Sequence, residues 1–184
     1  MSPTVINQRL KDLGGLHPCI GPGSSGTRSP LSEKEISELE DDLGVRLPAD
    51  YRQFLSEYGA CRFKSIVSSH PDLYYRIAHF LGGGQDENDS GHIRGAIAVF
   101  EGRMPDNILP IAECDDGAIC LGISKTVYGR IFYWDRENEW DWQQQERRSS
   151  GDALSIDEQF QNISELAESF EAFILDLQIV HPDE

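Results

Sequence analysis

The residues best suited to chemistry lie between positions 133 and 142, where aromatic and acidic side chains are interleaved. This run holds all three tryptophans of the chain. Tryptophan, tyrosine and arginine dominate the energetics of protein–protein contacts, and carboxylates attract a basic partner. The pattern therefore indicates a surface that binds another protein. Its candidate binding residues are Trp134, Asp135, Glu137, Glu139, Trp140 and Asp141.

Two other acidic groups are candidates for the same surface. Asp115 and Asp116 stand directly before Gly117, and this triplet predicts a hairpin turn between two strands. A long polar loop is expected over residues 82–91, and it contributes Asp86, Glu87 and Asp89. We expect these carboxylates to act by binding, because neighbouring carboxylates on a strand point to opposite faces and do not form an acid–base pair.

The patterns for metal binding are incomplete. The loop that begins at Asp86 starts like a calcium-binding loop, but Ile97 occupies the twelfth position, where a bidentate glutamate is needed. His17 and Cys19 are close enough for zinc but lack a second pair of ligands. Cys114 and Cys120 flank the predicted hairpin, where they could approach one another or simply fill the core.

The patterns for catalysis are absent from the sequence. No Gly-x-Ser-x-Gly motif presents a nucleophilic serine. The glycines 82–84 lack the Lys-Ser/Thr ending of a phosphate-binding loop. We therefore expect no catalytic residues, no metal and no cofactor.

The charge balance narrows the class of partner. The chain has 32 acidic and 16 basic side chains, and its formal net charge is −16. Nucleic acid is therefore a poor partner, since phosphate binding needs a basic face. A basic protein is a better electrostatic match, although acidity can also serve solubility alone. The oligomeric state is left open.

The location of the protein is expected to be cytoplasmic. The longest apolar runs are too short to span a bilayer, so no membrane association is predicted. The N-terminus lacks the apolar core of a signal peptide. The four cysteines are expected to be free thiols in a reducing compartment.

A pair of short helices carries the clearest local signals. Ser32 and Glu35 form a capping box at the start of the first helix, and Gly44 ends it. The second helix has Pro48 in its first turn, and Gly59 ends it. The apolar spacing of both segments predicts that each helix buries one face.

The remaining elements predict an α+β fold, a mostly antiparallel sheet meander packed by N-terminal helices and a C-terminal helix. If helices cover one face of the sheet, Phe132 and Trp134 lie at a groove or rim on the other. The alternative is that Trp134 and Trp140 cover the edge of the core. The expected strands span residues 73–81, 108–114, 118–123 and 129–135, with further helices over 5–13, 92–103 and 160–177 and a linker over 17–30.

The helix pair and the meander resemble the SUKH (Smi/Knr-like) superfamily. The resemblance rests on Ile36, Leu39, Glu40, Gly44, Leu47, Pro48, Asp50, Tyr51, Phe54, Leu55 and Gly59, and on Asp115, Asp116, Gly117, Gly129, Ile131, Tyr133 and Asp135. The chain departs from many members by having Tyr58 where they have asparagine before the turn glycine. The resemblance implies a single domain over residues 31–180, preceded by an extension over 1–30 made of a helix and a Gly/Pro/Ser-rich loop.

The same resemblance implies a function. Bacterial members of this kind are immunity proteins that bind and neutralise a cognate polymorphic toxin of contact-dependent competition. Such a toxin is often a nuclease with a basic active site, which an acidic surface would fit. The alternative is a regulatory or scaffold protein of the Smi/Knr type, and an enzyme is a third, disfavoured class.

Overall fold

The computed structural model describes residues 3–19, 30–69, 75–83, 91–139 and 161–180. Within these ranges the chain forms five helices and an antiparallel sheet of seven strands in the order β1-β2-β4-β5-β6-β7-β8. A separate pair joins β3 and β9. The expected α+β class and antiparallel meander are confirmed. The strands are β1 Leu16–Pro18, β2 Cys61–Phe63, β3 Val67–Ser68, β4 Ile77–Phe80, β5 Ile108–Cys114, β6 Gly117–Gly122, β7 Ile131–Asp135, β8 Ile163–Ala167 and β9 Gln178–Ile179; the helices are α1 Pro3–Asp12, α2 Glu33–Leu43, α3 Ala49–Glu57, α4 Ile93–Phe100 and α7 Phe170–Asp176.

The helix pair α2 and α3 forms as its local signals predict. The Ser32 side chain accepts from the Glu35 N–H, and the Glu35 carboxylate accepts from the Ser32 N–H, so the capping box is complete. Gly44 ends α2 in the left-handed conformation, with φ 65°. The buried faces of the two helices carry Ile36 and Leu39, and Tyr51, Phe54 and Leu55.

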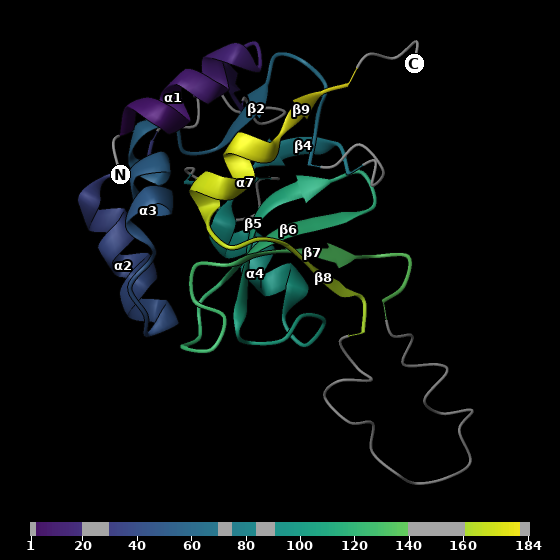
Figure 1. The fold of residues 1–184 in the computed structure, drawn as a ribbon. Coiled ribbons are helices and arrows are strands. Elements are labelled where there is room, and N and C mark those ends of the chain that lie inside the picture. Colours follow the sequence, from purple (N-terminus) through teal and green to yellow (C-terminus); the bar gives the residue numbers. More distant parts are fainter. Residues whose placement is uncertain (1–2, 20–29, 70–74, 84–90, 140–160, 181–184) are drawn as a thin grey trace, which may run out of the picture.

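Helices cover both faces of the sheet, so the expectation of one uncovered face is wrong. In one cross-strand row Phe80 is followed by Ala112, Ile119 and Tyr133, and Phe80 packs on Phe170 of α7. The next row ends at Trp134, on the opposite face, where its ring lies 5.2 Å from that of Phe100 in α4. Figure 1 shows α7 and α4 on opposite sides of the sheet.

The expected C-terminal helix over residues 160–177 is wrong in its first half. Residues Ile163–Ala167 form strand β8, which pairs antiparallel with β7, and only Phe170–Asp176 is helical. The hydrophobic spacing suits a helix, but the outer edge of β7 supplies backbone hydrogen bonds that residues 163–167 satisfy. Ser169 then starts the helix, because its side chain accepts from the Ala172 N–H.

The N-terminal segment belongs to the same core as the rest of the chain. Ile6, Leu10 and Leu13 of α1 and the turn after it are buried in the main hydrophobic cluster. Arg9 donates to the carbonyl oxygen of Leu177 beyond the end of α7. Strand β1, which lies where a linker was expected, pairs with β2 and becomes the first strand of the sheet. Residues 3–19 are therefore built into the fold.

Candidate functional site

Exposed carboxylates gather at one end of the sheet. The turn between β5 and β6 consists of Asp115 and Asp116, and both are exposed. The segment that leaves β7 lies beside this turn, because Gly117 pairs with Asp135 and the Arg136 N–H donates to the Asp116 carbonyl oxygen over 2.9 Å. The structure thus brings together four of the predicted residues, Asp115, Asp116, Asp135 and Glu137. We call them the acidic end.

The carboxylate of Asp135 organises the turn that follows β7. Its Oδ1 accepts from the backbone N–H groups of Glu137 and Asn138, over 2.9 and 3.4 Å. Its Oδ2 accepts from the Asn138 side-chain amide over 2.7 Å. A carboxylate that accepts three such bonds fixes the local backbone, so Asp135 holds the acidic end in shape as well as contributing charge.

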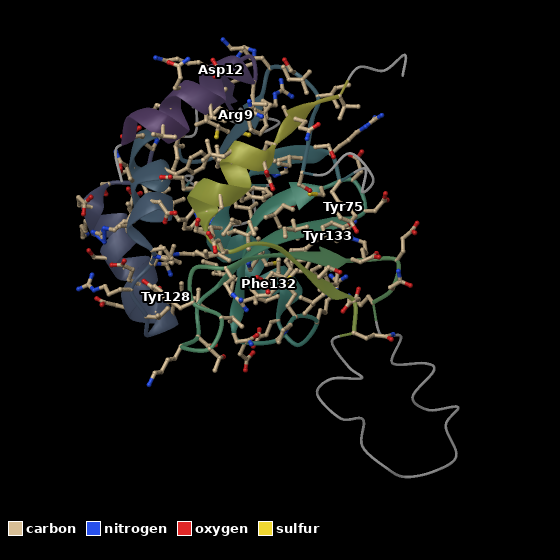
Figure 2. All side chains as sticks on the ribbon, in the orientation of Figure 1. Arg9, Asp12, Tyr75, Tyr128, Phe132 and Tyr133 are labelled. Carbon is tan, nitrogen blue, oxygen red and sulfur yellow. The ribbon has the colours of Figure 1, made fainter. Side chains whose placement is uncertain are left out.

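A polar pocket of about 230 Å³ opens beside Asp135. Tyr75 and Tyr133 form one side of it, with ring centroids 3.4 Å apart and planes 20° apart. Figure 2 shows these two tyrosines close together at the sheet end, on the side where β7 finishes. The lining residues are Tyr75, Tyr133, Asp135, Asn138, Gln161, Asn162 and Ser164. We call this the tyrosine–asparagine pocket; sequence reasoning missed it because its parts come from three separate segments.

Both tyrosines of the pocket stay protonated at neutral pH. Burial raises the pKa of Tyr133, which is 1% exposed, well above its usual value. Burial also raises the pKa of Tyr75, and the carboxylate of Asp135 adds to the effect. The pocket therefore presents neutral aromatic rings next to one carboxylate.

Two predicted contact residues have structural partners. Trp134 is fully buried, so the expectation that it lies at a groove or rim is wrong and it covers the core from within. Glu139 accepts two hydrogen bonds from Arg103, over 2.7 and 2.6 Å. Arg103 in turn lies over the rings of Phe100 and Trp134. Glu139 is thus tied to the α4 face of the sheet.

Other candidates fall outside the described residues. Asp86, Glu87 and Asp89 lie within residues 84–90, and Trp140 and Asp141 lie within 140–160. Their part in the surface stays a prediction.

The signature residues of the helix pair hold the fold together. Glu40, only 2% exposed, accepts from the Leu47 N–H over 2.9 Å and from Arg46 and Arg52. Burial opposes ionisation of Glu40, but these donors outweigh it and hold the pKa of the carboxyl below its usual value. Asp50 accepts from the Glu171 N–H over 3.1 Å and so joins α3 to α7. Both carboxylates therefore make contacts that hold the fold together; Glu40 is buried and Asp50 is partly buried.

A second concavity of about 500 Å³ lies between α2, α4 and the opposite end of β5. Its floor is apolar and includes Leu43, Ile97 and Met104, while Glu101 and Asp106 are exposed at its rim. Seven residues of extended strand put it about 20 Å from the Asp115–Asp116 turn. We call it the α2–α4 groove.

The described residues contain neither a cluster of metal ligands nor a membrane-spanning helix. No three histidine, cysteine or acidic side chains converge there as ligands would. No helix within the described ranges has the length and apolar character needed to cross a membrane. Three of the cysteines, Cys61, Cys114 and Cys120, are buried thiols, and burial raises the pKa of each well above its usual value.

Comparison with known proteins gives two matches. The sequence model of the SMI1 / KNR4 family (SUKH-1) matches residues 30–176. The SPbeta prophage-derived uncharacterized protein YokK of Bacillus subtilis (strain 168) is 30% identical over 158 residues, which cover 74% of this chain and 75% of that protein. The family match begins at residue 30, although residues 3–19 share the same core.

Proposed function

The chain belongs to the SMI1 / KNR4 family (SUKH-1), and from this we propose that it is a non-catalytic immunity protein that binds and neutralises a cognate toxin in the cytoplasm. The observation that carries the proposal is the acidic end, where Asp115, Asp116 and Glu137 are exposed together beside a pocket. Among the described residues, the lining of this pocket contains no lysine, arginine or histidine.

The charge of the chain supports a basic partner. A net charge of −16 accelerates encounter with a positively charged surface, and a nuclease that grips phosphates has such a surface. An inhibitor that covers this surface needs exposed carboxylates but no reactive group of its own. The relative YokK is described as prophage-derived and uncharacterized, which is compatible with this role but does not define it.

The proposal is tested by mixing the purified protein with the toxin encoded beside its gene. We expect toxin activity to be lost near an equimolar ratio. Toxicity that persists at a large excess of the protein would refute the immunity role and favour the regulatory or scaffold alternative.

A matched pair of double variants tests the surface. Asp115→Asn with Asp116→Asn removes two exposed charges at the acidic end, while Glu101→Gln with Asp106→Asn removes two at the α2–α4 groove. Both double variants change the net charge of the protein by the same amount, so each weakens the long-range attraction to a basic toxin equally. If the acidic end makes the contact, only the first pair weakens binding further, by about tenfold. A larger loss from the second pair would place the contact at the groove.

A further inference from the structure

We propose that the tyrosine–asparagine pocket binds the guanidinium group of a single arginine side chain supplied by a protein partner. This deepens the proposed function and rests on it, because the bound toxin would provide the arginine. Three features of the pocket favour this ligand: the hydrogen bonds of its two asparagines, its stacked tyrosines and the negative charge around its opening.

The two asparagines of the pocket each direct their side-chain amino group toward Asp135. The Asn138 Nδ2 donates to the Asp135 carboxylate over 2.7 Å, and the Asn162 Nδ2 donates to the Asp135 carbonyl oxygen over 2.7 Å. Asn162 is only 6% exposed, and its hydrogen bond to Asp135 is made by the amino group rather than by Oδ1. Both side chains therefore present carbonyl oxygens to the pocket. An amide oxygen that faces a pocket favours a ligand that donates.

The aromatic wall adds a preference for a flat cation. Tyr75 stacks on Tyr133, and Tyr75 is the partly exposed member of the pair. A guanidinium can lie against such a ring while its five N–H groups reach oxygens in its own plane. The same chain uses this chemistry internally, where Arg103 lies over Trp134 and donates to Glu139.

The negative charge of the described surroundings favours a cation over an anion. Asp135 lines the pocket, and Asp115, Asp116 and Glu137 are exposed near it. A lysine side chain also carries a positive charge, but all its donors are on one nitrogen atom. The carboxylate, amide and phenol oxygens are spread over the lining, so they better match the several N–H donors of an arginine guanidinium. Arg136 is an exposed cation of the chain next to this site, although it is not part of the lining.

The test is an NMR titration of the full chain with Nα-acetyl-arginine methylamide. The matched citrulline compound keeps the shape without the charge, and the matched lysine compound keeps the charge without the fork. We expect saturable shifts of the Asn138 and Asn162 side-chain amides with arginine, binding about tenfold weaker with lysine, and none with citrulline. Equal binding of lysine, or the absence of shifts at the two amides, would overturn the proposal.

A blocking variant separates the pocket from the surface around it. Ser164→Arg places a guanidinium at an exposed position of the pocket lining, while Thr126→Arg adds the same charge in the exposed turn between β6 and β7. We expect Ser164→Arg to reduce arginine binding at least tenfold and Thr126→Arg to reduce it little. Equal effects of the two variants would show that the added charge acts by general repulsion of the arginine compound, and would overturn the proposal.

The two proposals fail in different ways. If Ser164→Arg abolishes arginine binding yet still neutralises the toxin as the natural protein does, the immunity role stands and the pocket is not its anchor. If arginine binds as expected but no toxin is inhibited, the pocket stands as a site for a guanidinium and the immunity role falls.

Discussion

The guanidinium of Arg103 lies over the indole of Trp134, with 5.3 Å between its Cζ atom and the ring centroid, and donates two hydrogen bonds to Glu139. One side chain thus joins the buried core to the segment that continues from the acidic end. The salt bridge to Glu139 and the contact with the indole use the same guanidinium group, so replacing that planar group weakens both interactions.

Replacing Arg103 by lysine should destabilise the protein by about 1–2 kcal/mol, because an ammonium cannot make the paired hydrogen bonds and stacks less well on the indole. Arg130→Lys is the matched control, since the ion pair of Arg130 with Glu165 joins two largely exposed side chains and should change stability by less than about 0.5 kcal/mol. Urea unfolding followed by circular dichroism measures the stability of the two variants. Equal unfolding midpoints for Arg103→Lys and Arg130→Lys would contradict the role of Arg103.

Glu40→Gln should lower the unfolding free energy at neutral pH by about 1–3 kcal/mol, because the buried Leu47 N–H loses a charged acceptor. The pKa of Glu40 in the folded protein lies below its ordinary value of 4.5. Its stabilisation is therefore complete above about pH 4.5 and is lost as the pH falls through the folded pKa. The difference between natural protein and variant should shrink in the same range.

Glu38→Gln provides the control on the same helix. Glu38 is half-exposed, and its ion pair with Lys34, one helical turn away, joins two exposed side chains, so its loss should cost less than about 0.5 kcal/mol at any pH. A pH profile identical for the two variants would show that the partners of Glu40 do not set the acid sensitivity.

Gly117→Ala should destabilise the hairpin by about 1–3 kcal/mol. A Cβ at this position would lie 2.1 Å from the Trp134 carbonyl oxygen and 2.7 Å from the Tyr133 hydroxyl. Asp116→Ala, at the neighbouring exposed turn position, should change stability by less than about 0.5 kcal/mol. Thermal unfolding compares the two, and an unchanged midpoint for Gly117→Ala would disprove the close approach.

Iodoacetamide should modify Cys19 first in the native protein. Cys19 is partly exposed, whereas Cys61, Cys114 and Cys120 are buried, and burial raises the pKa of those three thiols and suppresses their thiolate forms. Peptide mass spectrometry before and after denaturation measures the order. Rapid native labelling of Cys120 would show that the sheet opens more readily than its packing indicates.

The helix pair was predictable from sequence because its signals are local. The capping box spans Ser32 to Glu35, and the left-handed turn needs only Gly44. Strand β5 was also predicted with its observed bounds, Ile108–Cys114, since a β-rich run meets a turn at Asp115. In both regions the local preference and the tertiary structure agree.

The parts that failed depend on distant segments. Residues 163–167 have helical spacing but become β8 because β7 offers an open edge. Trp134 alternates like an outward residue, yet α4 covers its face. Glu139 meets Arg103 across 36 positions, and Tyr75, in the segment before β4, meets Tyr133 of β7. Periodicity carries no information about such partners.

Glu40 makes its contacts within the folded chain, so under the proposed immunity role its environment would be the same whichever toxin is bound. The fold constrains Glu40, because its carboxylate binds the backbone of the same chain. Asp115, Asp116 and Ser164 are exposed, so the packing of the core constrains their side chains less. Under the same proposal, the exposed residues can change with the toxin while the buried framework is kept.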